Sequence, residues 1–156
     1  MAPPTVHTVS DPEFDELYVI SDLHMGGKAG FQLFNQGKLL SRWIDSLAAV
    51  PAAKRVALVI NGDMVDFLAE PDATYFDPRG AVNKLNRIAG DSAFKPVFDS
   101  LAKFTGVKNR HLVVTLGNHD LELMLPNVQT QFLSLLTGGN VRNRPRVTLD
   151  LLHSRQ

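Results

Sequence analysis

The sequence contains no cysteine in its 156 residues. Disulfide bonds, thiolate nucleophiles, cysteine-based zinc sites and iron–sulfur clusters are therefore excluded. Any metal ion bound by this chain must be held by nitrogen or oxygen atoms, which only His, Asp, Glu, Asn and the backbone supply in the usual ligand sets.

An excess of charge of either sign is also absent. Sixteen Lys and Arg residues balance sixteen Asp and Glu residues, so the formal net charge is zero. This balance gives no overall electrostatic signature for nucleic acid or for an anionic membrane. No stretch has the length of a transmembrane helix, and residues 1–16 lack the basic start and apolar centre of a secretory signal. We therefore expect a cytoplasmic protein with a flexible N-terminal arm over residues 1–16.

The composition is that of a globular domain, with 44% hydrophobic and 21% charged residues. Short apolar runs predict three buried strands, and a weaker alternation predicts a fourth; these segments are residues 17–20, 56–60, 112–116 and 146–152. Amphipathic segments between them predict helices, around residues 39–47, 82–88, 94–104 and 126–136. Strands that alternate with helices in this way indicate βαβ units, so we expect an α/β fold.

Each of the first three apolar runs ends in side chains that can bind a metal ion. Asp22 and His24 follow the first run, and Asp63 and Asp66 follow the second in the pattern Gly-Asp-x-x-Asp. The third run leads into Gly-Asn-His-Asp at residues 117–120. Ligands of open parallel sheets bind outside the carboxyl ends of the strands, so the three motifs are expected to meet at one edge.

Each motif alone also has an ordinary interpretation. Asp-x-His is expected by chance in roughly one chain in five of this size, as a helix cap and a surface histidine. Gly-Asp-x-x-Asp is often only a turn followed by a cap. Gly-Asn-His-Asp is much rarer, at about one chance occurrence in two thousand such chains. Because all three occur in order, each after a predicted strand, coincidence is a poor explanation.

The three motifs resemble the first three motifs of the calcineurin-like metallophosphoesterases, over about residues 17–138. The segment Ser-Asp-Leu-His-Met-Gly at residues 21–26 is most similar to bacterial members related to UDP-2,3-diacylglucosamine hydrolases. The resemblance implies a two-sheet αββα sandwich. It also implies hydrolysis of a phosphate mono- or diester by a metal-activated water.

The resemblance further implies two divalent metal ions, for which Mn, Fe, Zn and Co all suit nitrogen and oxygen ligands. Asp22 and His24 would bind the first ion, Asp63 would bridge both ions, and Asn118 would bind the second. Together the ions would activate a shared water molecule for attack on phosphorus.

Other motif residues have implied roles beside the ions. His119 would stabilise charge in the transition state or protonate the leaving oxygen. Asp120 would hydrogen-bond the imidazole of His119, and Asp66 would support the site without binding a metal. Gly62 and Gly117 would allow sharp turns at the ends of the strands.

The sequence departs from the family pattern after His119. The Gly-His-x-His motif that supplies the remaining ligands is missing, and His153 is the single later histidine. His153 follows Leu152, as the fourth-motif histidine of the family follows an apolar strand, but Ser154 stands where the family has Gly. We therefore expect an incomplete phosphoesterase domain over residues 17–156, either C-terminally truncated or completed by another chain. Its uncovered sheet would favour self-association.

Three functions stay open at this point. The first is metal-dependent hydrolysis of a phosphorylated small-molecule or lipid-linked substrate. The second is a truncated, non-catalytic remnant that binds metal or phosphate, because the later histidines are missing. A plain phosphate-binding α/β domain ranks last, since neither common glycine-rich phosphate loop is present.

Outside the motifs, we interpret His111 as a surface or edge residue and Arg142, Arg144 and Arg146 as a solvated segment.

Overall fold

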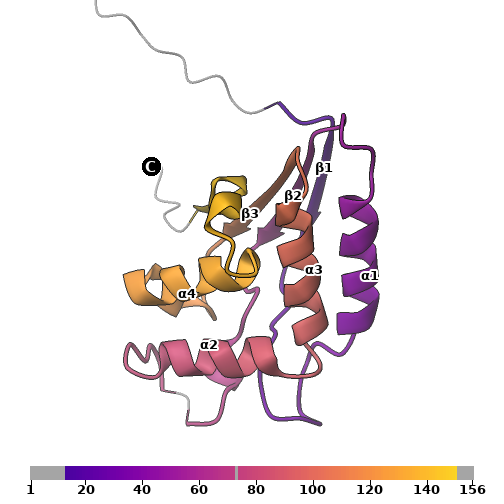
Figure 1. Cartoon of the computed structure of the whole chain (residues 1–156). Helices are drawn as coiled ribbons and strands as arrows, with labels where there is room; N and C mark the ends of the chain where they lie inside the picture. Colours follow the sequence, from indigo (N-terminus) through magenta and orange to yellow (C-terminus); the bar gives the residue numbers. More distant parts are fainter. Residues whose placement is uncertain (1–12, 73, 151–156) are drawn as a thin grey trace, which may run out of the picture.

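The computed structural model describes residues 13–150 with the exception of residue 73, and these form a parallel four-stranded sheet (Figure 1). The strands, in spatial order, are β1 (Glu16–Ile20), β2 (Val56–Asn61), β3 (Arg110–Thr115) and β4 (Val147–Asp150). Tyr18 on β1 is in register with Leu58 on β2, and Leu58 with Leu112 on β3. The predicted α/β fold with parallel strands is confirmed.

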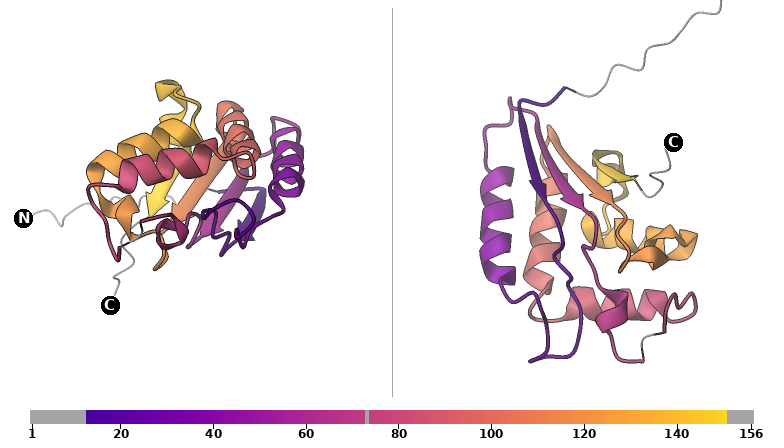
Figure 2. Two further views of the ribbon diagram at one scale, coloured as in Figure 1. Left: turned by 90° about the horizontal axis from the view of Figure 1, so that it is seen from below. Right: turned by 180° about the vertical axis from the view of Figure 1, so that it is seen from behind.

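The helices lie on one face of this sheet, as both views in Figure 2 show. The α-helices are α1 (Gly37–Ala48), α2 (Ala81–Gly90), α3 (Lys95–Gly106) and α4 (Pro126–Leu136). Short 3₁₀ helices are η1 (Phe67–Ala69), η2 (Leu121–Met124) and η3 (Val141–Arg146). Each connection moves from one strand to the next in the same direction across the sheet. Because such connections are right-handed, their helices collect on the same side.

The hydrophobic core lies between the sheet and this helical layer. Ile60 on β2 and Val114 on β3 are fully buried, as are Phe94 and Phe104 at the two ends of α3. Burying a side chain of this kind contributes about 1.5–3 kcal/mol. The core therefore holds the carboxyl ends of β2 and β3 rigidly beside each other.

The opposite face of the sheet is not covered by any of the described helices (Figure 2). Leu17 and Val19 on β1 point to this face, with exposed fractions of 62% and 58%. Val19 is in register with Val59, and Val59 with Val113, so an apolar strip crosses the sheet. The second sheet of the expected sandwich is not among the described residues.

The described residues begin within the predicted arm and end before the last histidine. Strand β1 begins at Glu16, so this last residue of the expected arm is part of the sheet. Residues 1–12 and His153 lie outside the described part. Among the described helices, none is long and apolar enough to cross a membrane.

Candidate metal centre

The three motifs occupy the loops that leave the carboxyl ends of β1, β2 and β3. The first two loops run side by side, because the backbone N–H of His24 donates to the Asp63 carbonyl and that of Asp66 donates to the Met25 carbonyl, both at 2.8 Å. The third loop joins them, since the backbone N–H of His119 donates to Oδ1 of Asp63 at 2.9 Å. The parallel topology thus brings the predicted motifs together at one edge.

The backbone at this edge adopts a conformation that is rare for residues with side chains. Asp22, His24 and Asp63 have φ angles of 55°, 47° and 50°. The left-handed region costs such residues about 1–2 kcal/mol each, and strain of this kind concentrates at functional sites. Gly62, with a φ of 79°, takes the sharp turn before Asp63 that the sequence predicted.

Asp22, His24 and Asp63 form a group whose ligand atoms all lie within 4.8 Å of one another. Nε2 of His24 lies 3.8 Å from Oδ1 of Asp22 and 3.7 Å from Oδ2 of Asp63. One imidazole nitrogen and two carboxylate oxygens are a ligand set that suits Zn, Fe, Co or Mn. The chemistry of these donors therefore fits the first metal ion that the sequence predicted.

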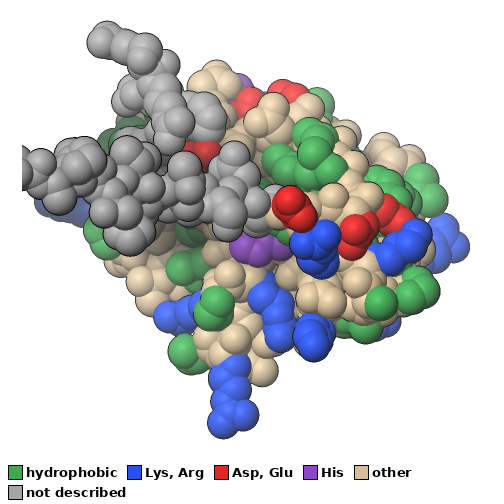
Figure 3. Space-filling view, turned by 90° about the horizontal axis from the view of Figure 1, so that it is seen from above, with side chains coloured by type: hydrophobic (Ala, Val, Ile, Leu, Met, Phe, Trp, Pro, Cys, Tyr) green, Lys and Arg blue, Asp and Glu red, His purple; other side chains and the backbone are tan. Residues whose placement is uncertain are grey.

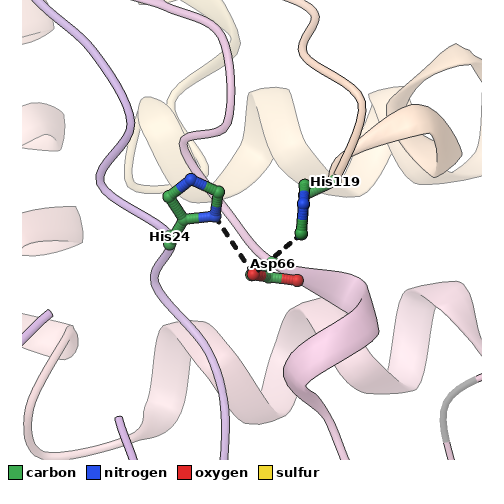
Figure 4. Close-up of side chains that lie close together, drawn as sticks. All are labelled: His24, Asp66 and His119. Atoms are coloured by element: carbon green, nitrogen blue, oxygen red, sulfur yellow. Dashed lines mark hydrogen bonds and ion pairs between the residues drawn. The ribbon is translucent and has the colours of Figure 1, made fainter. Parts of the chain in front are cut away.

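The carboxylate of Asp66 joins two imidazole rings (Figure 4). Its Oδ2 atom lies 3.1 Å from Nδ1 of His24 and 3.0 Å from Nδ1 of His119, and its Oδ1 atom accepts from the backbone N–H of Ala69 at 3.1 Å. These three acidic and imidazole side chains are also close enough to hold a cation, but hydrogen bonds already account for their proximity.

The contact with Asp66 determines how both histidines can act. An ionised carboxylate only accepts hydrogen bonds, so both Nδ1 atoms carry hydrogen and each neutral ring keeps a lone pair on Nε2. In His24 this Nε2 atom is the one that faces Asp22 and Asp63. Metal-binding histidines are commonly oriented in this way, by a carboxylate at the other ring nitrogen.

His119 is the more accessible of the two rings, with 33% of its side chain exposed against 21% for His24. The hydrogen bond with Asp66 raises the pKa of His119, although partial burial opposes this effect. The protonated form is therefore favoured relative to an isolated histidine. A partly exposed imidazole of this kind can donate a proton to a group bound beside it.

The position of Asp120 differs from the one the sequence suggested. Its Oδ1 atom accepts from the backbone N–H of Gly117 at 2.7 Å, and its Oδ2 atom accepts from that of Met64 at 2.9 Å. The carboxylate that contacts the ring of His119 is instead Asp66. Burial raises the pKa of Asp120 to about 6, although the two backbone hydrogen bonds oppose this rise. Asp120 thus connects the third loop to the second.

Asn118, the predicted ligand of a second ion, is exposed on the same turn as His119.

One contact near the motifs was not predicted. The buried side chain of Glu70 accepts from the backbone N–H of Gly27 at 3.1 Å and lies 3.7 Å from Nε of Arg87. Glu70 belongs to no motif, so nothing in the sequence pattern pointed to this link between the first two loops.

Comparison with known families agrees with this geometry. The model of the calcineurin-like phosphoesterase family matches residues 16–153, a range that includes all three motifs and ends at His153. No curated protein and no solved structure gives a significant match. The order of the motifs, their convergence at one edge of the sheet and the family match lead to one conclusion. The chain belongs to the calcineurin-like phosphoesterase family.

Proposed function

We propose that this protein hydrolyses phosphate esters at a metal centre held by Asp22, His24 and Asp63. The observation that carries the proposal is the group of these three side chains beside His119, with Asp66 in contact with both imidazoles. A divalent ion bound there would polarise a phosphoryl oxygen and lower the pKa of a bound water molecule. Holding the ions and giving a proton to the leaving oxygen depend on residues of this chain.

Asp63 is the residue that we assign to both ions of a two-metal site. Its Oδ2 atom faces His24, while its Oδ1 atom is held by the backbone N–H of His119. Asn118 would contribute its amide oxygen to the second ion, and Mn, Fe, Zn and Co all suit these donors. His153 is the candidate for a further ligand.

We assign proton donation or charge stabilisation to His119. Asp66 supports this role, because it fixes hydrogen on Nδ1 and favours the protonated ring. A protonated Nε2 would then give its hydrogen to the leaving oxygen of the ester. Asp120 would act on the chemistry only by holding the Gly117 turn in place.

The proposed substrate is a phosphorylated small molecule, with a lipid-linked phosphoester as the second candidate. The partly exposed His119 and exposed Asp22 leave the centre open to a molecule from solution. We further propose that the protein acts in the cytoplasm, and that it is related to the bacterial UDP-2,3-diacylglucosamine hydrolases.

A second function is favoured by one specific observation. The 156 residues contain no Gly-His-x-His motif, and within them the second ion has Asp63 and Asn118 as ligands, with His153 as a candidate. With so few ligands the second site would be weak, and a two-metal reaction would then be slow. In that case the chain would bind a metal ion or phosphate without turnover.

The deciding experiment is hydrolysis of a chromogenic phosphodiester by the purified chain with added Mn²⁺, combined with calorimetric Mn²⁺ titration. We expect turnover and Mn²⁺ binding, both lost in Asp63→Asn. Asp99→Asn is the matched control, since Asp99 is an exposed residue on α3 that pairs with Lys95. Mn²⁺ binding without turnover would favour the binding module, and unchanged turnover in Asp63→Asn would rule out the proposed centre.

A further inference from the structure

A pocket lies at the end of the sheet where the strands begin, opposite the candidate metal centre. Figure 3 views this end of the molecule, on which Lys and Arg side chains gather. The pocket has a volume of about 450 Å³. The lining side chains used below are Phe14, Arg55, Lys108, Arg110, His111 and Arg146.

The lining of this pocket carries an excess of positive charge, although the whole chain is neutral. Among the residues that the structure describes, four Lys and Arg side chains and one acidic side chain, that of Glu13, line it. Arg55 lies 3.8 Å from Oε2 of Glu13 and 3.5 Å from Oδ2 of Asp15. Arg55 thus shares its charge with two nearby carboxylates, and the excess of positive charge comes mainly from Lys108, Arg110 and Arg146. Asp63 and Asp66 lie at the opposite edge of the sheet.

Arg110 forms a fixed floor for the pocket and is not free to bind a ligand. Its buried guanidinium donates to the backbone carbonyls at the end of α1 and in the following loop, namely those of Leu47, Ala48, Val50 and Lys54. These bonds satisfy carbonyl groups that a helix terminus leaves unpaired. They also tie α1 to the start of β3, so the pocket is already formed without a ligand.

Lys108 and Arg146 supply positive charge above this floor. Lys108 is exposed and forms no hydrogen bond or ion pair with any residue in the described part of the chain. One terminal nitrogen of Arg146 donates to the Thr105 carbonyl at 2.9 Å and to Oδ1 of Asn143 at 3.1 Å. These bonds hold the Arg146 side chain in place and leave its other terminal nitrogen for an anion.

Two aromatic side chains form a wall of the pocket. The rings of Phe14 and His111 lie 5.9 Å apart between centroids, and Nε2 of His111 lies 2.8 Å from Oγ1 of Thr148. Burial lowers the pKa of His111, so the ring is neutral near pH 7. The neutral ring can donate an N–H to an anion without adding a charge of its own. Because the ring lies in the pocket, its pKa and its NMR signals should change when an anion binds.

We propose that this pocket is a second binding site, for a small phosphate-bearing anion that contacts Arg55, Lys108 and Arg146. Strands of five or six residues separate it from the metal centre by about 15–20 Å. A ligand in this pocket is therefore a different molecule from the one hydrolysed at the metal centre. The inference does not depend on the proposed function.

The test is an NMR titration of the full chain with inorganic pyrophosphate, at low salt and in EDTA, followed through the ring protons of His111. We expect saturable shifts and a rise in the pKa of His111, because the negative charge of a bound anion favours the protonated ring. The charged groups that line the pocket with His111 are Arg55, Lys108, Arg110 and Arg146 as well as Glu13. Lys108→Gln should weaken binding roughly two- to fivefold, as loss of one exposed charge contact does. Loss of Lys108 and Arg146 together should weaken it further.

Two control variants separate this site from other sources of binding. Lys95→Gln removes one exposed cation at the start of α3, outside the pocket, and should leave the affinity unchanged. Asp63→Asn should also leave it unchanged, because Asp63 lies at the other edge of the sheet. Thermal melting will show whether Arg146→Gln still folds, and Lys108→Gln alone carries the test if it does not.

Three results would overturn the proposal. The first is the absence of His111 shifts up to millimolar pyrophosphate. The second is an equal loss of affinity in Lys95→Gln and Lys108→Gln, which would indicate only general charge attraction. The third is loss of binding in Asp63→Asn, which would place the anion at the candidate metal centre.

Discussion

Gly117 and Asp63 approach each other so closely that Gly117 has no room for a side chain. A Cβ atom at Gly117 would overlap with the Asp63 carboxylate and would lie 2.5 Å from the Asp63 backbone nitrogen. Positive φ does not explain this glycine, since its φ is not in the left-handed region. The glycine is needed because the third motif loop packs directly against the residue proposed to hold both metal ions.

Gly117→Ala should therefore disturb the metal centre as well as the fold. Forcing a methyl group into a closely packed site costs about 1–3 kcal/mol. We expect a lower free energy of unfolding and weaker Mn²⁺ binding, measured by urea denaturation and calorimetry. Gly90→Ala is the matched control, because a Cβ there meets no atom within 4 Å. Comparable losses in both variants would contradict this explanation.

Asp66→Asn tests the carboxylate shared by two histidines. An amide has only one acceptor oxygen, so the variant side chain could not accept from the two Nδ1 atoms and from the backbone N–H of Ala69 together, as the two oxygens of Asp66 do. At least one of these contacts is lost, and the position of the rings is less well fixed. We expect a lower pKa for His119, because the hydrogen bond that raises it is weakened. Loss of such a supporting carboxylate reduces metal affinity or activity by about 10- to 100-fold.

The measurements for Asp66→Asn are an NMR titration of the His119 ring, a pH–rate profile and Mn²⁺ affinity. Asp99→Asn provides the comparison for removal of a carboxylate on the surface. An unchanged His119 pKa together with unchanged Mn²⁺ affinity would show that Asp66 does not position either ring.

His111 predicts a pH dependence of stability. Burial lowers its pKa in the folded state below the ordinary value of 6.5. As the pH falls through 6.5 towards the lowered value, the unfolded chain binds the proton first, so this residue makes folding less favourable. His111→Asn should reduce the loss of stability between about pH 7.5 and about pH 5.5. Urea denaturation at these two pH values measures the loss of stability. An identical loss in the variant would show that His111 is not the source of the pH dependence.

The open face of the sheet predicts self-association. Val19 is 58% exposed there, within an apolar strip that includes Val59 and Val113. Val19→Lys should shift the protein towards the monomer, as followed by sedimentation velocity over a range of concentrations. Val141→Lys is the control, because Val141 is 65% exposed but lies in η3, away from the strip. Equal behaviour of the two variants would argue against association through the sheet.

Much of the fold could be predicted because its signals are local. Apolar runs marked the positions of β1, β2 and β3. A proline at the start of α4 and Gly138 with Gly139 after its end, at φ angles of 59° and 76°, agree with the predicted helix bounds. The convergence of the motifs also followed, since parallel strands place their carboxyl ends at the same edge.

The amino-acid sequence alone was therefore sufficient for the strands, the motif loops and the family. Only the tertiary structure showed that Asp66, and not Asp120, contacts His119, because the direction of a carboxylate depends on backbone donors distant in the chain, such as the N–H of Met64. The basic pocket was equally hidden, since a net charge of zero says nothing about where charges gather. Arg55, Lys108 and Arg146 become neighbours through the order of the strands, which places the starts of β2, β3 and β4 side by side.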